Sequence, residues 1–502
     1  MNSAEFTISE LQDLFATGTS SAADICRAYL GRIGEIDGAG PTLRSVIEVN
    51  PDALAIAQEL DEERRQNGPR GPLHGVPILV KDNIDTGDAM MTTAGSLALE
   101  GNVAGQDAHV VRRLREAGAV LLGKTNLSEW AFFRSRHGIG GWSSRGGQTR
   151  NPYALDRSPS GSSSGSGAAV AANLCTVAIG TETDGSIISP SSINGLVGLK
   201  PTLGLVSRSG IIPIAASQDT AGPMARTVAD AAAVLTAIAG PDAADPVTKA
   251  SADRASADYG RFLQPNGLEG ARLGVARDFF GRHGAVDAVI ERAIARLSGL
   301  GATIVDPVRF PTVADVSRAE SLVMLREFKV GVTRYLADHD RAPVRSLADV
   351  IAFNREHADS MMPLFGQELL ERAEAFGEAQ EADYQAARAA CIRLTRDEGI
   401  DRALGEDDLH AIIAPSADPA SLVDPVLGDT LIIRGTPRSC HLPAVAGYPH
   451  ITVPAGFVKG LPVGLSFFGG PFEEGRLIQY AYAFEQATQA RRPPTFPETL
   501  KG

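Results

Sequence analysis

The stretch SPSGSSSGSGAAVAA, residues 158–172, places a cluster of glycines and serines directly before small apolar residues. A serine hydroxyl becomes an effective nucleophile only when a base removes its proton. Two other residues stand in comparable settings: Lys81 ends the apolar run GVPILVK, and Ser186 follows the strand-like run CTVAIGTETDG. Each has an ordinary explanation, since a lysine at a strand end usually reaches solvent and a serine in a turn allowed by Gly185 is commonly only a turn residue.

Three structures are compatible with residues 158–172. A Gly/Ser linker would join domains of different composition, but this stretch lies inside one continuous alternation of strands and helices. The run 161–165 also fits GxSxG, whose serine follows an apolar strand, yet a proline-containing coil precedes it and neither His441 nor His450 stands out as its partner. We favour a helix beginning at AAVAANL, because glycines and serines before a helix leave free N–H groups and room for close approach.

A second motif match has a structural explanation. Residues 118–125, GAVLLGKT, fit the phosphate-loop pattern GxxxxGK[ST]. That loop binds phosphate through backbone N–H groups in a flexible turn. The middle residues Ala-Val-Leu-Leu are strand formers, so we expect a buried strand followed by a tight turn and no nucleotide site.

The composition limits the classes of function. The chain has 502 residues, 43% of them hydrophobic, and a net charge of −13, which repels nucleic acid and anionic membranes. Its four cysteines form no CxxC pair and its nine histidines show no metal-ligand spacing, so we expect reduced thiols, no metal and no cofactor. The first residues lack the pattern of a signal peptide, and no apolar run is long enough to span a membrane. A cytoplasmic location follows as an expectation.

Alternating strands and helices predict an α/β protein with a mixed, mostly parallel central sheet covered by helices on both sides. Capping-box spacing marks two early helices, at Thr7 with Glu10 and at Ser21 with Asp24. We expect residues 1–65 to form an N-terminal helical segment that packs on a single domain, residues 66–502. Long helical patterns with few strand signals predict a helical insertion at about 314–405, lying over the sheet.

Taken together, the segments resemble the amidase signature family. The resemblance rests on VKDN, the Gly/Ser loop and AAVAANLCTVAIGTETDGS, and it continues through GKTNLSEW, GLVGLKPTLGLVS, DTAGPMARTVADAA and AGYPHITVPAGFVKGLPVGLSFFG. It therefore covers nearly the whole chain, roughly residues 20 to 495. It implies that Ser186 is the acylated nucleophile, that Lys81 is the base, and that Ser162, after a cis peptide bond at Gly161, bridges the two.

Elementary chemistry agrees with these roles. Lys81 can act as a base only when neutral, and burial favours its neutral form. The hydroxyl of Ser162 can both donate and accept, so it can pass a proton from Ser186 to Lys81. The natural oxyanion hole is the set of backbone N–H groups in the turn at the nucleophile, from Thr183, Asp184, Gly185 and Ser186. Ser163 matches a supporting position in this network, or it is a loop serine facing water.

The resemblance also places a substrate pocket, with six candidate lining residues that could equally be ordinary core or surface: Phe132, Phe133, Arg136, His137, Gly138 and Trp142.

Many family members have Gly-Gly-Ser-Ile-Arg at the nucleophile, whereas this chain has Asp184-Gly185-Ser186-Ile187-Ile188. This departure argues against an amidotransferase subunit that acts on tRNA. The closest resemblance is to bacterial peptide amidases, which implies a small-molecule or short-peptide amide as the substrate. An aryl acylamidase that hydrolyses anilides is the alternative, and a catalytically silent binding protein is disfavoured by the intact Lys81, Ser162 and Ser186. The sequence gives no oligomeric state.

Overall fold

A computed structural model describes residues 5–431 and 438–500 of the chain. Its centre is an eleven-stranded sheet, in the order β1-β3-β2-β6-β8-β7-β12-β13-β11-β9-β10. In that order the strands are Val46–Val49, Val120–Thr125, Pro77–Lys81, Val177–Glu182, Thr220–Ala225, Val197–Lys200, His450–Val458, Leu461–Phe468, Ala411–Pro415, Arg272–Ala276 and Thr303–Val308. A small hairpin, β4 (Trp142–Ser143) with β5 (Gly147–Gln148), lies outside this sheet.

The predicted mixed α/β fold is confirmed, and its parallel pairs are confined to two groups. These are β3-β2-β6 and β11-β9-β10. The neighbours between the two groups are antiparallel, as is the pair of β1 with β3. The sheet is therefore parallel on its flanks and antiparallel in its centre, where tight connections such as the hairpin of β12 and β13 take the place of crossover helices.

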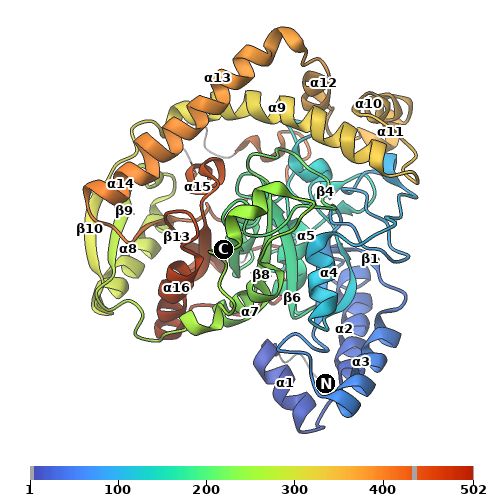
Figure 1. Cartoon of the computed structure of the whole chain (residues 1–502), viewed down its shortest axis with the longest axis horizontal. Helices are drawn as coiled ribbons and strands as arrows, with labels where there is room; N and C mark the ends of the chain where they lie inside the picture. Colours follow the sequence, from blue (N-terminus) through green and yellow to red (C-terminus); the bar gives the residue numbers. More distant parts are fainter. Residues whose placement is uncertain (1–4, 432–437, 501–502) are drawn as a thin grey trace.

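Helices cover the sheet on both sides (Figure 1). They are α1 Ile8–Ala16, α2 Ala22–Arg32, α3 Ala53–Asn67, α4 His109–Glu116, α5 Ser164–Ala171, α6 Ile188–Ile193, α7 Val228–Ile238, α8 Gly284–Gly299, α9 Val313–Asp338, α10 Leu347–Glu356, α11 Ala358–Met361, α12 Glu368–Glu374, α13 Glu381–Ile392, α14 Asp401–Glu406, α15 His441–Ala446 and α16 Glu474–Thr488. Both predicted capping boxes are present, at the starts of α1 and α2. None of the helices in the described residues is long and apolar enough to cross a membrane.

The N-terminal segment and the 314–405 region occupy opposite sides of the molecule (Figure 1). Between β10 and β11 the chain forms helices α9 to α14 without a strand, and α13 packs along α9. Residues 1–65 contribute more than helices, because β1 pairs with β3 at the edge of the sheet. Residue 65 itself falls within α3. The division into a segment, a domain and an insertion stays a prediction. The four cysteines are buried free thiols, as expected.

A second hydrophobic cluster joins the helical region to the loop after β3. Phe328 of α9 is fully buried, and its ring centroid lies 4.8 Å from that of Phe133 and 6.2 Å from that of Trp130. These aromatic contacts fix the position of α9 over the carboxyl end of β3. Any cavity between α9 and the sheet therefore has a rigid wall on this side.

Truncation of Phe328 tests this coupling. Phe328→Ala removes a buried ring from between α9 and the β3 loop, and is expected to lower the free energy of unfolding by about 3–5 kcal/mol. The readout is the thermal midpoint followed by circular dichroism. Val330→Ala is the matched control, because Val330 lies on the same helix and is 49% exposed. Equal midpoints for the two variants would contradict the coupling.

Candidate active site

The stretch 158–172 is a tightly packed helix start. Residues 162–172 are buried, and α5 begins at Ser164. The glycines are required by close approach: a Cβ at Gly161 would lie 2.2 Å from Oγ of Ser128, and one at Gly165 would lie 2.2 Å from the carbonyl oxygen of Ser45. The linker interpretation is thereby excluded, and the preference for a helix start is confirmed.

Lys81 ends β2 and does not reach solvent. Its side chain is fully buried, and Nζ lies 2.7 Å from Oγ of Ser162, 2.9 Å from Oγ1 of Thr181 and 3.2 Å from the Thr181 carbonyl oxygen. Within the described residues it forms no ion pair. Burial lowers the pKa of Lys81 to about 7, against the weaker opposing attraction of Glu182 and Asp219.

The three contacts of Lys81 are all with neutral oxygen atoms, and a neutral amine can make all three. A neutral amine has two N–H donors and one lone pair. The Thr181 carbonyl can only accept, and Oγ1 of Thr181 is 3.0 Å from the donating amide of Asn83. With both N–H groups directed to Thr181, the lone pair remains for the hydroxyl of Ser162. Sequence reasoning missed Thr181 and Asn83, although both lie within the motifs that it used, GTETDGS and VKDN.

Backbone contacts link the Gly/Ser loop to the turn that carries Ser186. The peptide bond between Gly161 and Ser162 is cis, as the resemblance implied. The N–H of Ser163 donates to the carbonyl oxygen of Ser186 at 3.2 Å, and its buried hydroxyl donates to the Thr181 carbonyl at 3.1 Å. Ser163 therefore supports the network and does not face water. The nucleophile-elbow interpretation of this serine fails, because its hydroxyl contacts backbone and no histidine in the described structure.

The turn between β6 and α6 presents Ser186 with free backbone donors. Gly185 has φ 79°, a conformation that favours glycine, and its Cβ would lie 2.7 Å from Sγ of Cys440. In the described part of the chain, the N–H groups of residues 183–186 donate no hydrogen bond. Glu182 fixes the far side of the turn, since its Oε2 accepts from the N–H groups of Ile187 at 2.7 Å and Ile188 at 3.0 Å.

A charged cluster holds Asp184 from the other side. Nδ1 of His441 lies 3.0 Å from Oδ2 of Asp184 and 3.5 Å from Oε2 of Glu320 on α9, while Arg438 is 3.9 Å from Asp184. The two carboxylates outweigh the burial of the ring and raise the pKa of His441 to about 9. The carboxylate oxygens of Asp184 and Glu320 and a ring nitrogen of His441 lie within 4.8 Å of one another, and carboxylate and imidazole groups at this spacing could also bind a metal ion. Sequence reasoning did not find this cluster.

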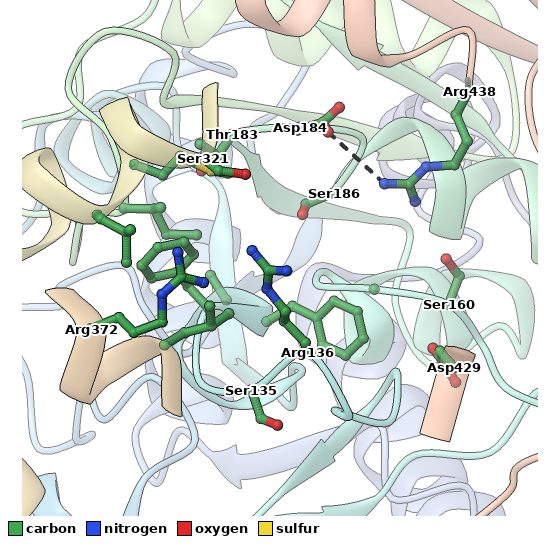
Figure 2. Close-up of a pocket in the computed structure, with 18 residues that line it drawn as sticks. Ser135, Arg136, Ser160, Thr183, Asp184, Ser186, Ser321, Arg372, Asp429 and Arg438 are labelled. Atoms are coloured by element: carbon green, nitrogen blue, oxygen red, sulfur yellow. Dashed lines mark ion pairs between the residues drawn. The ribbon is translucent and has the colours of Figure 1, made fainter. Parts of the chain in front are cut away.

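Ser186 opens into a cavity of about 450 Å³ between the sheet and the helical region (Figure 2). Phe132, Phe133 and Arg136 line it, as the resemblance implied. His137, Gly138 and Trp142 are not among the residues that line it, and Trp142 packs edge-on against Phe365 at 5.0 Å. Gly161, Thr183 and Asp184, which the sequence analysis placed beside the nucleophile, also line it. The remaining lining residues, several of them from α9 and α12, were not foreseen: Ala131, Ser135, Ser160, Ile214, Ser321, Met324, Leu325, Leu369, Arg372, Asp429 and Arg438.

Comparisons with known proteins show which family the chain resembles. The Amidase family model matches residues 24–478. The native peptide amidase from Stenotrophomonas maltophilia is 53% identical, with a TM-score of 0.93, over 98% of this chain and 99% of that one. A "probable amidase" of Arabidopsis thaliana is 42% identical over 98% of this chain and 92% of its own length. A glutamyl-tRNA(Gln) amidotransferase subunit of Myxococcus xanthus is 39% identical over 97% of this chain and 98% of its own length.

The family implied by the sequence motifs is therefore confirmed, and the buried lysine, the serine turn and the cavity all fall within the matched residues. This protein belongs to the amidase signature family and is an amide C–N hydrolase.

Proposed function

We propose that the protein hydrolyses small amides through an acyl-enzyme on Ser186, with Lys81 as the base and Ser162 as the bridge between them. The observation that carries the proposal is the distance of 2.7 Å between Nζ of Lys81 and Oγ of Ser162, in a buried site where Lys81 has no ion-pair partner among the described residues. A neutral lysine accepts the proton of Ser162, which in turn accepts the proton of Ser186 as that oxygen attacks the amide carbonyl.

The turn at Ser186 supports the next step. Attack on the carbonyl places negative charge on its oxygen, and the unused N–H groups of residues 183–186 are donors for that charge. Return of the proton through Ser162 to the leaving nitrogen releases the amine or ammonia. A water molecule activated by the same base then hydrolyses the ester on Ser186 and restores the free enzyme.

The substrate we propose is the C-terminal amide of an amino acid or a short peptide. Support comes from the similarity to the Stenotrophomonas maltophilia peptide amidase over nearly the whole of both chains. Aryl acylamidase activity is the second candidate, because Phe132 and Phe133 line the cavity and could stack on an aryl leaving group. An amidotransferase subunit is disfavoured by Asp184 and Ile188, which stand where many family members have glycine and arginine.

The buried free cysteines suit the cytoplasmic location that we also propose.

The proposed mechanism uses no metal. The only group of metal-ligating types found among the described residues is Asp184, Glu320 and His441. The carboxylates of Asp184 and Glu320 raise the pKa of His441, which favours a protonated ring between them. We propose that the protonated His441 bridges the two carboxylates and holds the turn that carries Ser186.

Lys81 sets the first expectation. Because the base must be neutral, kcat/KM should rise with pH through an ionisation near the Lys81 pKa of about 7, and level off above it. Lys81→Met should lose activity by ~10²–10⁴-fold. Lys124→Met is the matched control, since Lys124 is a second fully buried lysine, on the adjacent strand β3. A Lys81→Met enzyme with a normal rate and pH profile would remove Lys81 from the mechanism.

Metal removal gives the second expectation. Prolonged treatment with EDTA or 1,10-phenanthroline should leave kcat unchanged, and metal analysis of the purified enzyme should find no stoichiometric transition metal. Glu320→Gln is the matched variant, because it removes one possible metal ligand and keeps the shape of the side chain. It should respond to the chelators as the unchanged enzyme does. Loss of activity that returns on addition of one divalent ion would show that the Asp184–Glu320–His441 cluster is a metal site.

Substrate choice tests the function itself. The comparison is kcat/KM for a blocked dipeptide amide against an acyl anilide with a similar acyl group, with Ser186→Ala as the inactive control. We expect the peptide amide to be preferred, with release of ammonia and no cleavage of internal peptide bonds. Some activity on the anilide is expected, since small differences in a pocket discriminate only about 10- to 200-fold. An anilide preference of about 100-fold or more would assign aryl acylamidase activity instead.

A further inference from the structure

Three arginine side chains line the cavity that contains Ser186, in a chain whose net charge is −13. Arg136 follows the aromatic residues after β3, Arg372 lies on α12, and Arg438 lies just before α15. In Figure 2 the side chains of Arg136 and Arg372 project into the same open space as the hydroxyl of Ser186. A concentration of positive charge at the cavity of an acidic protein favours anionic ligands.

The three arginines differ in what they contact. Arg438 lies 3.9 Å from Asp184, the carboxylate that His441 also contacts. Arg136 and Arg372 are exposed, and among the described residues their guanidinium groups form no ion pair and no hydrogen bond. Two guanidinium groups without a carboxylate partner are therefore available in the substrate cavity.

The carboxylates of Glu368 and Glu371, which are close to Arg372 in the sequence, already have other hydrogen-bond or ion-pair partners. Oε1 of Glu368 accepts from the N–H of Arg136 at 2.6 Å and from the hydroxyl of Ser135 at 2.9 Å. Glu371 pairs with Arg355 of α10 at 2.9 Å. Because Glu368 and Arg372 are four residues apart on α12, the helix that presents Arg372 also anchors the loop that presents Arg136.

Two other acidic residues, Asp184 and Asp429, line the cavity. Asp184 is held by His441, and Asp429 accepts from the N–H of Gly140 at 2.9 Å. Figure 2 shows Asp429 beside Ser160, with Arg136 between Asp429 and Arg372. The cavity lining also includes apolar side chains, among them Leu369 of α12 and Met324 of α9, so a bound carboxylate would meet guanidinium groups beside apolar surface.

We propose that Arg136 and Arg372 bind a carboxylate on the substrate, so that the preferred substrates are amides with an acidic acyl part, such as the α-amides of acidic amino acids and acidic peptides. The inference rests on the proposed function. When ammonia is the leaving group, all other atoms of the substrate belong to the acyl side, so the carboxylate stays on the part that is esterified to Ser186. Arginine suits this role because its planar fork can bind both carboxylate oxygens.

The test separates binding from catalysis. In the inactive Ser186→Ala enzyme, calorimetry measures the Kd of N-acetyl-L-glutamic acid α-amide and of N-acetyl-L-methioninamide, a neutral amide of similar length. We expect the acidic amide to bind roughly tenfold more tightly, as a partly exposed charge-assisted contact provides. Arg136→Gln and Arg372→Gln should each reduce this ratio severalfold, and the double variant should bring it close to one. Arg292→Gln, an exposed arginine of α8 outside the cavity, should leave it unchanged.

Hydrolysis of the same two amides by the active enzyme distinguishes the possible failures. A Kd ratio near one, with both amides hydrolysed, would overturn the carboxylate site and leave the proposed function intact. A preference that persists in the Arg136→Gln/Arg372→Gln double variant would also overturn the assignment to these residues. If the acidic amide binds selectively but neither amide is hydrolysed, the carboxylate site stands and the peptide-amide function fails.

Discussion

The burial of one amine, which lowers the pKa of Lys81 to about 7, is the constraint on which the proposed site depends. Lys81 is enclosed by β2 and its neighbours, and the parallel register that pairs Val80 with Ile179 brings the end of β2 next to Thr181 of β6. Thr181 supplies neutral oxygens at the place where a carboxylate would raise the pKa of the lysine. The sheet must stay closed around this amine, because entry of water would stabilise the protonated form, raise the pKa of Lys81 and leave it without a free lone pair at neutral pH.

The turn at Ser186 is fixed by carboxylates that serve as hydrogen-bond acceptors. Glu182 accepts two backbone N–H groups at the start of α6, and Asp184 faces His441. Burial of carboxylates is costly unless each is partnered, and here the partners come from two parts of the chain, the start of α6 and His441. Glu320 of α9 contacts His441, which in turn contacts Asp184 of the turn at Ser186. The helical region that covers the cavity therefore also supports this turn. Substrate binding and alignment of the nucleophile therefore share one set of supports.

Sequence reasoning identified those site residues that lie at the end of a strand or the start of a helix, beside an apolar run in the sequence. Lys81, Ser162 and Ser186 each follow or begin a short apolar segment, and the structure places them at one end of the sheet. Glu320 and Arg372 escaped it because they lie on helices, where only tertiary packing decides which face turns inward. Trp142, in strand β4, was misplaced for a different reason: an aromatic side chain suits a cavity wall and a packed core equally well. The antiparallel centre of the sheet was also missed, because alternation of strands and helices cannot reveal where a hairpin such as β12 with β13 replaces a crossover.

The site is assembled from segments that are distant in the chain, since Lys81, Ser186, Glu320 and His441 come from four separate regions. During synthesis the first two leave the ribosome long before the histidine that clamps the turn. Contacts of such long range form late in folding. A nascent chain that contains Lys81 and Ser186 but not His441 thus lacks the finished cavity, so the proposed hydrolysis would begin only after the chain has been made as far as His441.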